Sequence, residues 1–200
     1  MRNKLAGVLA CAAIAGCATP AAEERTRERT ASADAITVIN HGFESSNTTR
    51  AGDPEGWVSI QHAGLRSYAF VVDAETRRSG AKSLRIDYIG SEPFGSILQQ
   101  VNALPWQGRT VRLSGWLKTK GVTGSPAGHG AALTLNAMRA GSILAHDHMT
   151  ATPLVGTNDW TYREITLAIP PGTEKVEVGA MLQGPGTLWL DDVELAVLPR

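Results

Sequence analysis

Cysteine is scarce in this 200-residue chain, which has two, Cys11 and Cys17, both near the N-terminus. The sequence from residue 18 onward has no thiol, and this excludes disulfide bridges, cysteine-ligated zinc and thiol catalysis from any domain that follows. Long hydrophobic runs are lacking too. The apolar run of residues 5–14 is too short to span a bilayer as a helix.

That short run has the surroundings of an export signal. Arg2 and Lys4 precede it, and the small residues Ala15 and Gly16 follow it. A charged start, a short apolar segment and small residues before a cleavage point are typical of a signal peptide. We therefore expect residues 1–17 to be a signal that is removed on export.

The end of this signal, "IAGC" at residues 14–17, resembles the lipobox of bacterial lipoproteins, with Ile14 in place of the usual Leu. The resemblance implies cleavage before Cys17, lipidation of its thiol and attachment to a membrane. Ala18 follows, where this family uses Asp for retention in the inner membrane. We expect an outer membrane lipoprotein, on the periplasmic face or the cell surface. The alternative is an ordinary secretory signal that contains a cysteine by chance.

Large apolar side chains are missing from residues 18–35, which hold Ala, Thr, Ser, Pro and charges of both signs. Such a composition cannot bury enough surface to offset chain entropy, so we expect a disordered tether. Residues 36–200 are enough for one domain with a sizeable core. Without residues 1–17 the chain has 17 Lys plus Arg against 19 Asp plus Glu, a net charge of −2. With no basic cluster, nucleic acid binding has no electrostatic support.

Helical periodicity is also absent from residue 36 onward. Short segments of alternating apolar and polar residues follow one another, separated by Gly, Pro, Asn and Asp. Strands without crossover helices pair largely antiparallel, so the pattern predicts an all-β domain: a two-sheet β-sandwich with jelly-roll or Greek-key connections. Nine strand-like runs are expected, at residues 35–40, 67–74, 82–89, 96–101, 110–119, 131–139, 161–169, 175–182 and 187–198.

Several of these segments, in this order, resemble carbohydrate-binding modules of the CenC type, within the galactose-binding-like jelly rolls. The resemblance implies this fold and implies much less about carbohydrate, because the same fold occurs in domains without a known ligand. The segments that carry it are "NHGFE" at 40–44, "GW" at 56–57, "RSGAKSLRI" at 78–86, "LQQ" at 98–100, "VRLSGWLKT" at 111–119, "TNDWTYREITLAIP" at 157–170 and "GTLWLDDVEL" at 186–195.

Asp191 raises a separate question. Strand alternation places it with Trp189 and Val193 on the face that we expect to be the core side. A buried carboxylate needs a partner. In the modules that this chain resembles, a structural calcium ion joins the Glu of "GFE" to an Asp of the last strand and to nearby backbone carbonyls. This implies Glu44 and Asp191 as ligands here, with carbonyl oxygens from the turn of residues 80–82. The alternative partner is a set of backbone N–H groups or an Arg such as Arg85.

Catalytic motifs are lacking: there is no G-x-S-x-G, no H-E-x-x-H and no recognisable pair of facing carboxylates. We therefore expect a non-catalytic binding module and favour it over the remaining alternative, a polysaccharide-active enzyme. Glycan sites place aromatic rings against sugars and polar groups at the edges. The candidate rings are Trp57 and Trp116, and the candidate polar groups are Gln99, Gln100, Arg112 and His146.

Two partners remain open for such a module. One is a glycan, and we expect it to lie across the polar face of residues 112–118, which carries Trp116. The other is a second envelope protein, docked on the same fold without any sugar. His146 and His148, two residues apart, could also form half of a zinc site, but the pattern favours a rim loop with solvated side chains.

Overall fold

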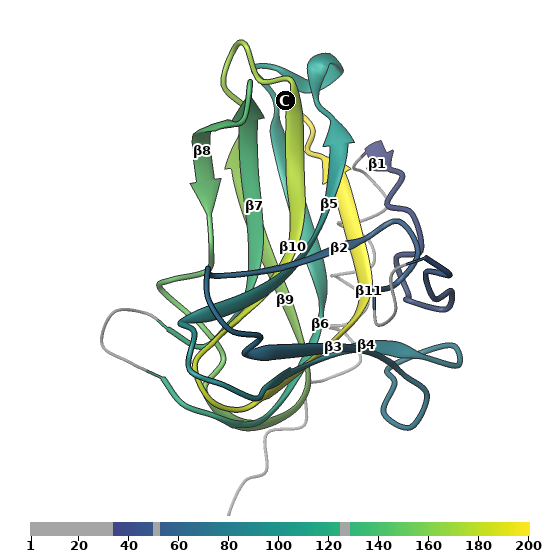
Figure 1. Ribbon diagram of the computed structural model, residues 1–200. Helices are drawn as coiled ribbons and strands as arrows, with labels where there is room; N and C mark the ends of the chain where they lie inside the picture. Colours follow the sequence, from purple (N-terminus) through teal and green to yellow (C-terminus); the bar gives the residue numbers. More distant parts are fainter. Residues whose placement is uncertain (1–33, 50–52, 125–128) are drawn as a thin grey trace, which may run out of the picture. The chain divides into compact units, whose positions relative to one another are not determined.

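The computed structural model describes residues 34–49, 53–124 and 129–200 (Figure 1). Within these residues there is no α-helix, and the only helical turn is a 3-10 helix at Leu104–Trp106 (η1). The eleven strands are β1 (Asp34–Ile36), β2 (Val58–Gln61), β3 (Tyr68–Asp73), β4 (Ser83–Tyr88), β5 (Phe94–Asn102), β6 (Thr110–Val122), β7 (Ala131–Arg139), β8 (Ser142–Asp147), β9 (Gly156–Ala168), β10 (Lys175–Gln183) and β11 (Thr187–Val197).

The strands form two sheets. The six-stranded sheet has the order β3-β4-β11-β6-β9, with β1 also paired to β11, and the five-stranded sheet has the order β2-β5-β10-β7-β8. Every strand pair is antiparallel. The predicted all-β, two-sheet sandwich is therefore confirmed.

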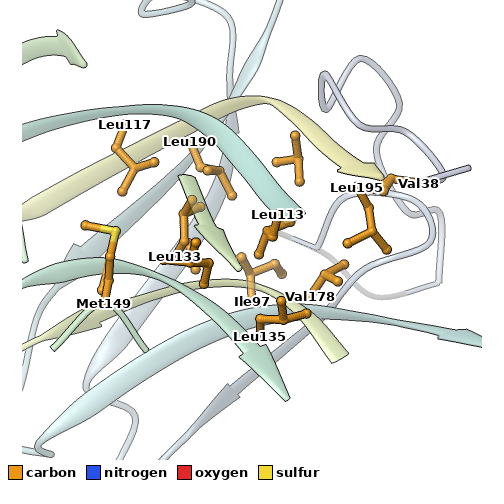
Figure 2. Close-up of a cluster of buried hydrophobic side chains, with 14 of the residues drawn as sticks. Val38, Ile97, Leu113, Leu117, Leu133, Leu135, Met149, Val178, Leu190 and Leu195 are labelled. Carbon is orange, nitrogen blue, oxygen red and sulfur yellow. The ribbon is translucent and has the colours of Figure 1, made fainter. Parts of the chain in front are cut away.

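The core lies between the sheets and follows from strand alternation. On β6, Val111, Leu113 and Leu117 point inward, as the sequence predicts. Leu133 and Leu135 of β7 approach them from the five-stranded sheet (Figure 2). Further side chains in this cluster come from both sheets and from the segments that follow β1 and β8: Val38, Ile97, Met149, Val178, Leu190 and Leu195.

All nine predicted runs contain a strand, but two strands were not predicted. They are β2 and β8, which form the two edges of the five-stranded sheet. β2 has only four residues, and β8 has a bulge opposite Ala137 and Met138, so neither shows a long alternating pattern. His146 lies within β8 and not in the rim loop that the sequence favours.

The predicted faces of the last strand are wrong for its first half. Leu188 and Leu190 belong to the core, so Trp189 lies on the outer face. A β-bulge between Asp191 and Glu194, with Asp192 at a φ of 50°, then shifts the alternation by one residue. The bulge lies where β11 changes its neighbour, from β4 at residues 187–190 to β1 at residues 195–197.

The predicted signal, the lipidation site at Cys17 and nearly all of the predicted tether lie outside the described residues. Among the described residues, no helix is long and apolar enough to cross a membrane.

Candidate functional site

Trp57 and Gln99, two predicted ligand contacts, lie in the interior. Trp57 is 1% exposed, its ring packs against Phe43 at 5.0 Å, and its Nε1 donates to the carbonyl oxygens of Ile39 and Asn40 at 3.0 and 3.2 Å. Gln99 is 4% exposed and forms a 2.8 Å hydrogen bond with the N–H of Ile39. In this arrangement both side chains hold the chain segment around Ile39 to the sandwich and neither presents a surface to a ligand.

Arg112 and Trp116 lie on the outer face of the six-stranded sheet, as predicted from β6. Arg112 is 5% exposed. Trp116 is half-buried, with the guanidinium of Arg78 4.2 Å from its ring centroid and Tyr162 in edge contact at 5.6 Å. One side of the Trp116 ring is therefore already covered by a cation.

Tyr162 links this aromatic contact to a carboxylate. Its hydroxyl donates to Oε2 of Glu164 at 3.3 Å. Burial is the main cause that raises the pKa of Tyr162, so the phenol stays protonated at neutral pH.

Asp191 and Glu44 both face the turn of residues 78–82. Oδ2 of Asp191 accepts the backbone N–H groups of Arg78 and Ser79 at 2.8 and 3.1 Å. The carboxylate of Glu44 accepts the N–H of Ala81 at 3.0 Å. Within this turn Gly80 has a φ of 57°, and a Cβ there would collide with the carboxylate of Glu44. The partner of Asp191 in this arrangement is a set of backbone N–H groups, the alternative that the sequence left open.

This arrangement bears on the predicted calcium site. Calcium binds six to eight oxygen ligands, and the resemblance implies that carbonyls of this turn would supply some of them. The turn instead directs N–H groups to both carboxylates. In the described part of the chain, no group of three or more His, Cys, Asp or Glu side chains could hold a metal ion. The residues as arranged do not fit calcium, and the turn would have to present carbonyl oxygens before they did.

The burial of Asp191 has an electrostatic consequence. The side chain is fully buried, although it lies on the outer side of β11 beside Trp116. Burial raises the pKa of Asp191, and the N–H groups of Arg78 and Ser79 oppose this effect. The carboxylate is thus held in place by backbone donors, as expected for a structural residue.

A different set of polar side chains gathers on the outer face of the five-stranded sheet. Val176 and Val178 point into the core, so Glu177 between them points outward. In the sheet register Glu177 lies between Gln100 of β5 and Asn136 of β7, and Asn136 in turn lies opposite His146 of β8. The pairing of β5, β10, β7 and β8 thus aligns four polar residues across the sheet.

Hydrogen bonds connect three of these residues and two of their neighbours into a continuous row, which we call the polar row. Gln100 and Asn136 each donate to the carboxylate of Glu177, at 2.9 and 3.4 Å. Lys175 donates to Oε1 of Gln100 at 3.1 Å, and His148 bonds to Oδ1 of Asn136 at 2.7 Å. The polar row is therefore Lys175, Gln100, Glu177, Asn136 and His148.

Aromatic and apolar side chains lie beside this row. The rings of His146 and His148 pack against each other with centroids 4.8 Å apart. Exposed apolar side chains occur on both edge strands, Val58 and Ile60 on β2 and Ile143 on β8. The same face thus offers hydrogen-bonding groups in its middle and apolar contact at its edges.

Other polar contacts of the domain are structural or isolated. Asp73, 5% exposed, accepts hydrogen bonds from Nε1 of Trp189 at 2.8 Å and from Arg85 at 3.1 Å, which ties β3, β4 and β11 together. His62 and Glu92 form an exposed pair at 2.6 Å, and the His62 ring also lies in edge contact with Phe94, with centroids 5.9 Å apart.

Comparison with known proteins gives no match to any family model. A curated relative from Bacillus subtilis (strain 168), the "Uncharacterized HTH-type transcriptional regulator YbfP", is 32% identical over 147 residues, which is 70% of this chain and 46% of the relative. The chain therefore spans less than half the length of the curated relative that it matches.

Solved structures resemble the sandwich more completely. The CBM22-1 xylan-binding domain from Paenibacillus barcinonensis has a TM-score of 0.58 at 19% identity, over 84% of this chain and 97% of that domain. A cyclase from Fischerella sp. TAU has a TM-score of 0.57 at 15% identity, over 84% of this chain and 98% of the cyclase. A further xylan-binding domain of family 22 has a TM-score of 0.52 at 16% identity, over 78% of this chain and 92% of that domain. The described domain therefore has the fold of carbohydrate-binding modules, a fold that an enzyme also shares.

Proposed function

We propose that this protein is a non-catalytic module that binds a glycan on the outer face of its five-stranded sheet. The observation that carries the proposal is the polar row, with its central carboxylate between two amides. Glycans present closely spaced hydroxyl groups, and side chains already held by hydrogen bonds can bind them at little entropic cost.

The apolar edges of this face support the same function. Pyranose rings have apolar faces that pack against aromatic and aliphatic side chains. The ring of His146 and the exposed side chain of Ile143 lie on β8, at one end of the polar row. Val58 and Ile60 offer similar contact on the opposite edge strand. The likeness to xylan-binding domains makes xylan the first glycan to test.

The cyclase likeness raises the alternative of an enzyme. A catalytic site needs an acid, base or nucleophile placed by a second group. In the polar row Glu177 is the one carboxylate, and both of its oxygens already accept hydrogen bonds from amides. His62 bonds to Glu92 and to the carbonyl oxygen of Ala63, and among the described residues no hydrogen bond joins it to a nucleophile. We therefore favour binding over catalysis.

A second binding function is docking on another envelope protein. It would use the same exposed apolar side chains of β2 and β8, which a protein partner could cover as well as a sugar could. The polar row favours a glycan over this partner, because burying its carboxylate against an apolar protein surface would be costly.

We also propose that Cys17 anchors the domain to the outer membrane, on the periplasmic face or at the cell surface. The lipobox-like "IAGC" and the composition of residues 18–35 support this. DNA is not among the proposed partners, although the curated relative is named an HTH-type regulator. The described residues hold no α-helix to act as a recognition element, and the chain has no basic cluster.

Retention on polysaccharide tests the glycan function. The wild-type protein should be retarded in gels that contain soluble xylan or another neutral polysaccharide. Glu177→Gln should weaken this binding about tenfold or more, because it replaces the central acceptor. Glu164→Gln, on the outer face of the other sheet, is the matched control and should bind like wild type. Wild-type mobility unchanged by every polysaccharide, together with capture of an envelope protein through β2 and β8, would favour docking.

A further inference from the structure

We propose that Lys175 and His148 are the positioning residues of the glycan site, because they fix the direction of every hydrogen bond in the polar row. This inference rests on the proposed function of this face. Neither residue needs to touch the sugar. They act through the two amides, Gln100 and Asn136, whose donor and acceptor ends they orient.

Which group donates and which accepts in each hydrogen bond follows from Glu177 at the centre of the row. An ionised carboxylate accepts hydrogen bonds and donates none. Because the side chains of Gln100 and Asn136 both approach Glu177, at 2.9 and 3.4 Å, each must turn its NH2 group toward the carboxylate. The amide oxygens then point away from Glu177, toward the two ends of the row.

The residues at the two ends of the row, Lys175 and His148, are placed to donate to these amide oxygens. Nζ of Lys175 can only donate, and it meets Oε1 of Gln100 at 3.1 Å. At the other end, Oδ1 of Asn136 meets Nε2 of His148 at 2.7 Å. Since that oxygen is an acceptor, Nε2 of His148 must carry a hydrogen atom. A donor at each end and an acceptor in the middle leave neither amide free to flip.

The ring of His148 is held in this role by its surroundings. It packs against His146 with centroids 4.8 Å apart. Burial lowers the pKa of His148, the neighbouring His146 lowers it further, and Asp147 opposes them. At neutral pH the ring is therefore uncharged, with its single hydrogen on Nε2 and an unprotonated Nδ1.

The fixed direction determines what the row presents to a ligand. Each amide has one N–H left after bonding to Glu177, so β5, β10 and β7 present a donor, an acceptor and a donor in turn. The two amide nitrogens lie 2.9 and 3.4 Å from the carboxylate oxygens of Glu177, a spacing similar to that between oxygens on adjacent carbons of one sugar residue. The matching ligand is a neutral glycan with a donating hydroxyl between two accepting oxygens. A carboxylate at the central position would meet the like charge of Glu177.

The tautomer of His148 gives a test that needs no ligand. Long-range proton–nitrogen correlation spectra at pH 7.5 should show a hydrogen on Nε2 and none on Nδ1. The Asn136→Ala variant removes the acceptor oxygen and should release this preference, which assigns the signal to the contact. A hydrogen on Nδ1 of His148 in the wild type would overturn the inference.

Binding of xylohexaose and cellohexaose, measured by calorimetry, tests the effect on the site. His148→Gln keeps a donor and should retain binding within about threefold, whereas His148→Glu offers only acceptors, turns Asn136 around and should weaken binding about tenfold or more. At the other end, Lys175→Arg should bind like wild type and Lys175→Glu should not.

Equal affinities of the Gln and Glu variants at residue 148, with unchanged melting temperatures, would contradict the inference. No binding by the wild type would instead contradict the proposed function, and the tautomer measurement would still decide the inference.

Discussion

The guanidinium of Arg78 lies over the ring of Trp116, with 4.2 Å between its central carbon and the ring centroid. Arg78 belongs to the same turn whose N–H groups bind Asp191, which is paired with Trp116 in the sheet. The turn, the bulged strand β11 and the ring are therefore one packed unit on the outer face of the six-stranded sheet. The sequence predicts Trp116 as a stacking platform for a glycan, and this contact offers a packing role as the alternative.

The two roles of Trp116 predict different results for Trp116→Ala. A half-buried ring with a cation–π contact and a Tyr neighbour should contribute about 1–3 kcal/mol to the free energy of unfolding. We expect denaturant unfolding to show a loss of that size, while retention on polysaccharide stays as in the wild type. Lost retention with a stability change below about 0.5 kcal/mol would restore Trp116 as the ligand platform.

The fold could be predicted because its strands alternate cleanly. Val111, Leu113 and Leu117 of β6 are core residues, and the polar residues between them face outward. The error on β11 has a local cause. A bulge at Asp191 and Asp192 reverses the alternation within one strand, and a period of two residues cannot reveal where that happens.

The candidate site was only partly predictable. Gln100 and His146 lie on the proposed glycan face, whereas Gln99 shares the inward face with Ile97 and Val101. The alternation of β5 was enough to separate Gln99 from Gln100. The alignment with Glu177 and Asn136 was not predictable, because it depends on which strands are neighbours, and residues 100, 136 and 177 are far apart in the sequence.

Membrane attachment through Cys17 is tested by cell fractionation. The wild-type chain, expressed in a bacterium that processes lipoproteins, should sediment with the outer membrane. Cys17→Ser should release it into the soluble periplasmic fraction, since the lipid is the only anchor proposed. Cys11→Ser, in the same N-terminal segment, serves as the control and should remain attached. Equal sedimentation of wild type and Cys17→Ser would contradict the lipoprotein prediction.

The calcium prediction is tested by thermal unfolding. An ion that binds only the folded state stabilises it by about 2.7 kcal/mol at a hundredfold excess over its Kd. If calcium binds, the melting temperature should be higher in millimolar calcium than in chelator. This difference between the two conditions should be smaller for Glu44→Gln than for the wild type. Equal melting temperatures in both conditions would support the arrangement described above, in which backbone N–H groups bind Glu44 and Asp191.

The last prediction concerns Asp73 and acid. Burial favours the neutral form of Asp73, but hydrogen bonds from Trp189, Glu75 and Thr76, with the charge of Arg85, outweigh it and lower the pKa of Asp73 below its ordinary value of 3.8. A lowered carboxylate pKa contributes stability that is fully present above pH 3.8 and is lost as the pH falls through the folded-state value.

Asp73→Asn should therefore cost about 1–3 kcal/mol in the free energy of unfolding at pH 7, because it removes a charged acceptor from Trp189 and Arg85. The difference from the wild type should shrink below pH 3.8, where protonation begins to remove the same charge. Urea unfolding at pH 7, 5 and 3 measures both effects, with Asp159→Asn as the control at an exposed carboxylate whose ion pair with Lys118 should contribute little. A cost that stays constant from pH 7 to pH 3 would show that Asp73 acts through its shape and hydrogen bonds and not through its charge.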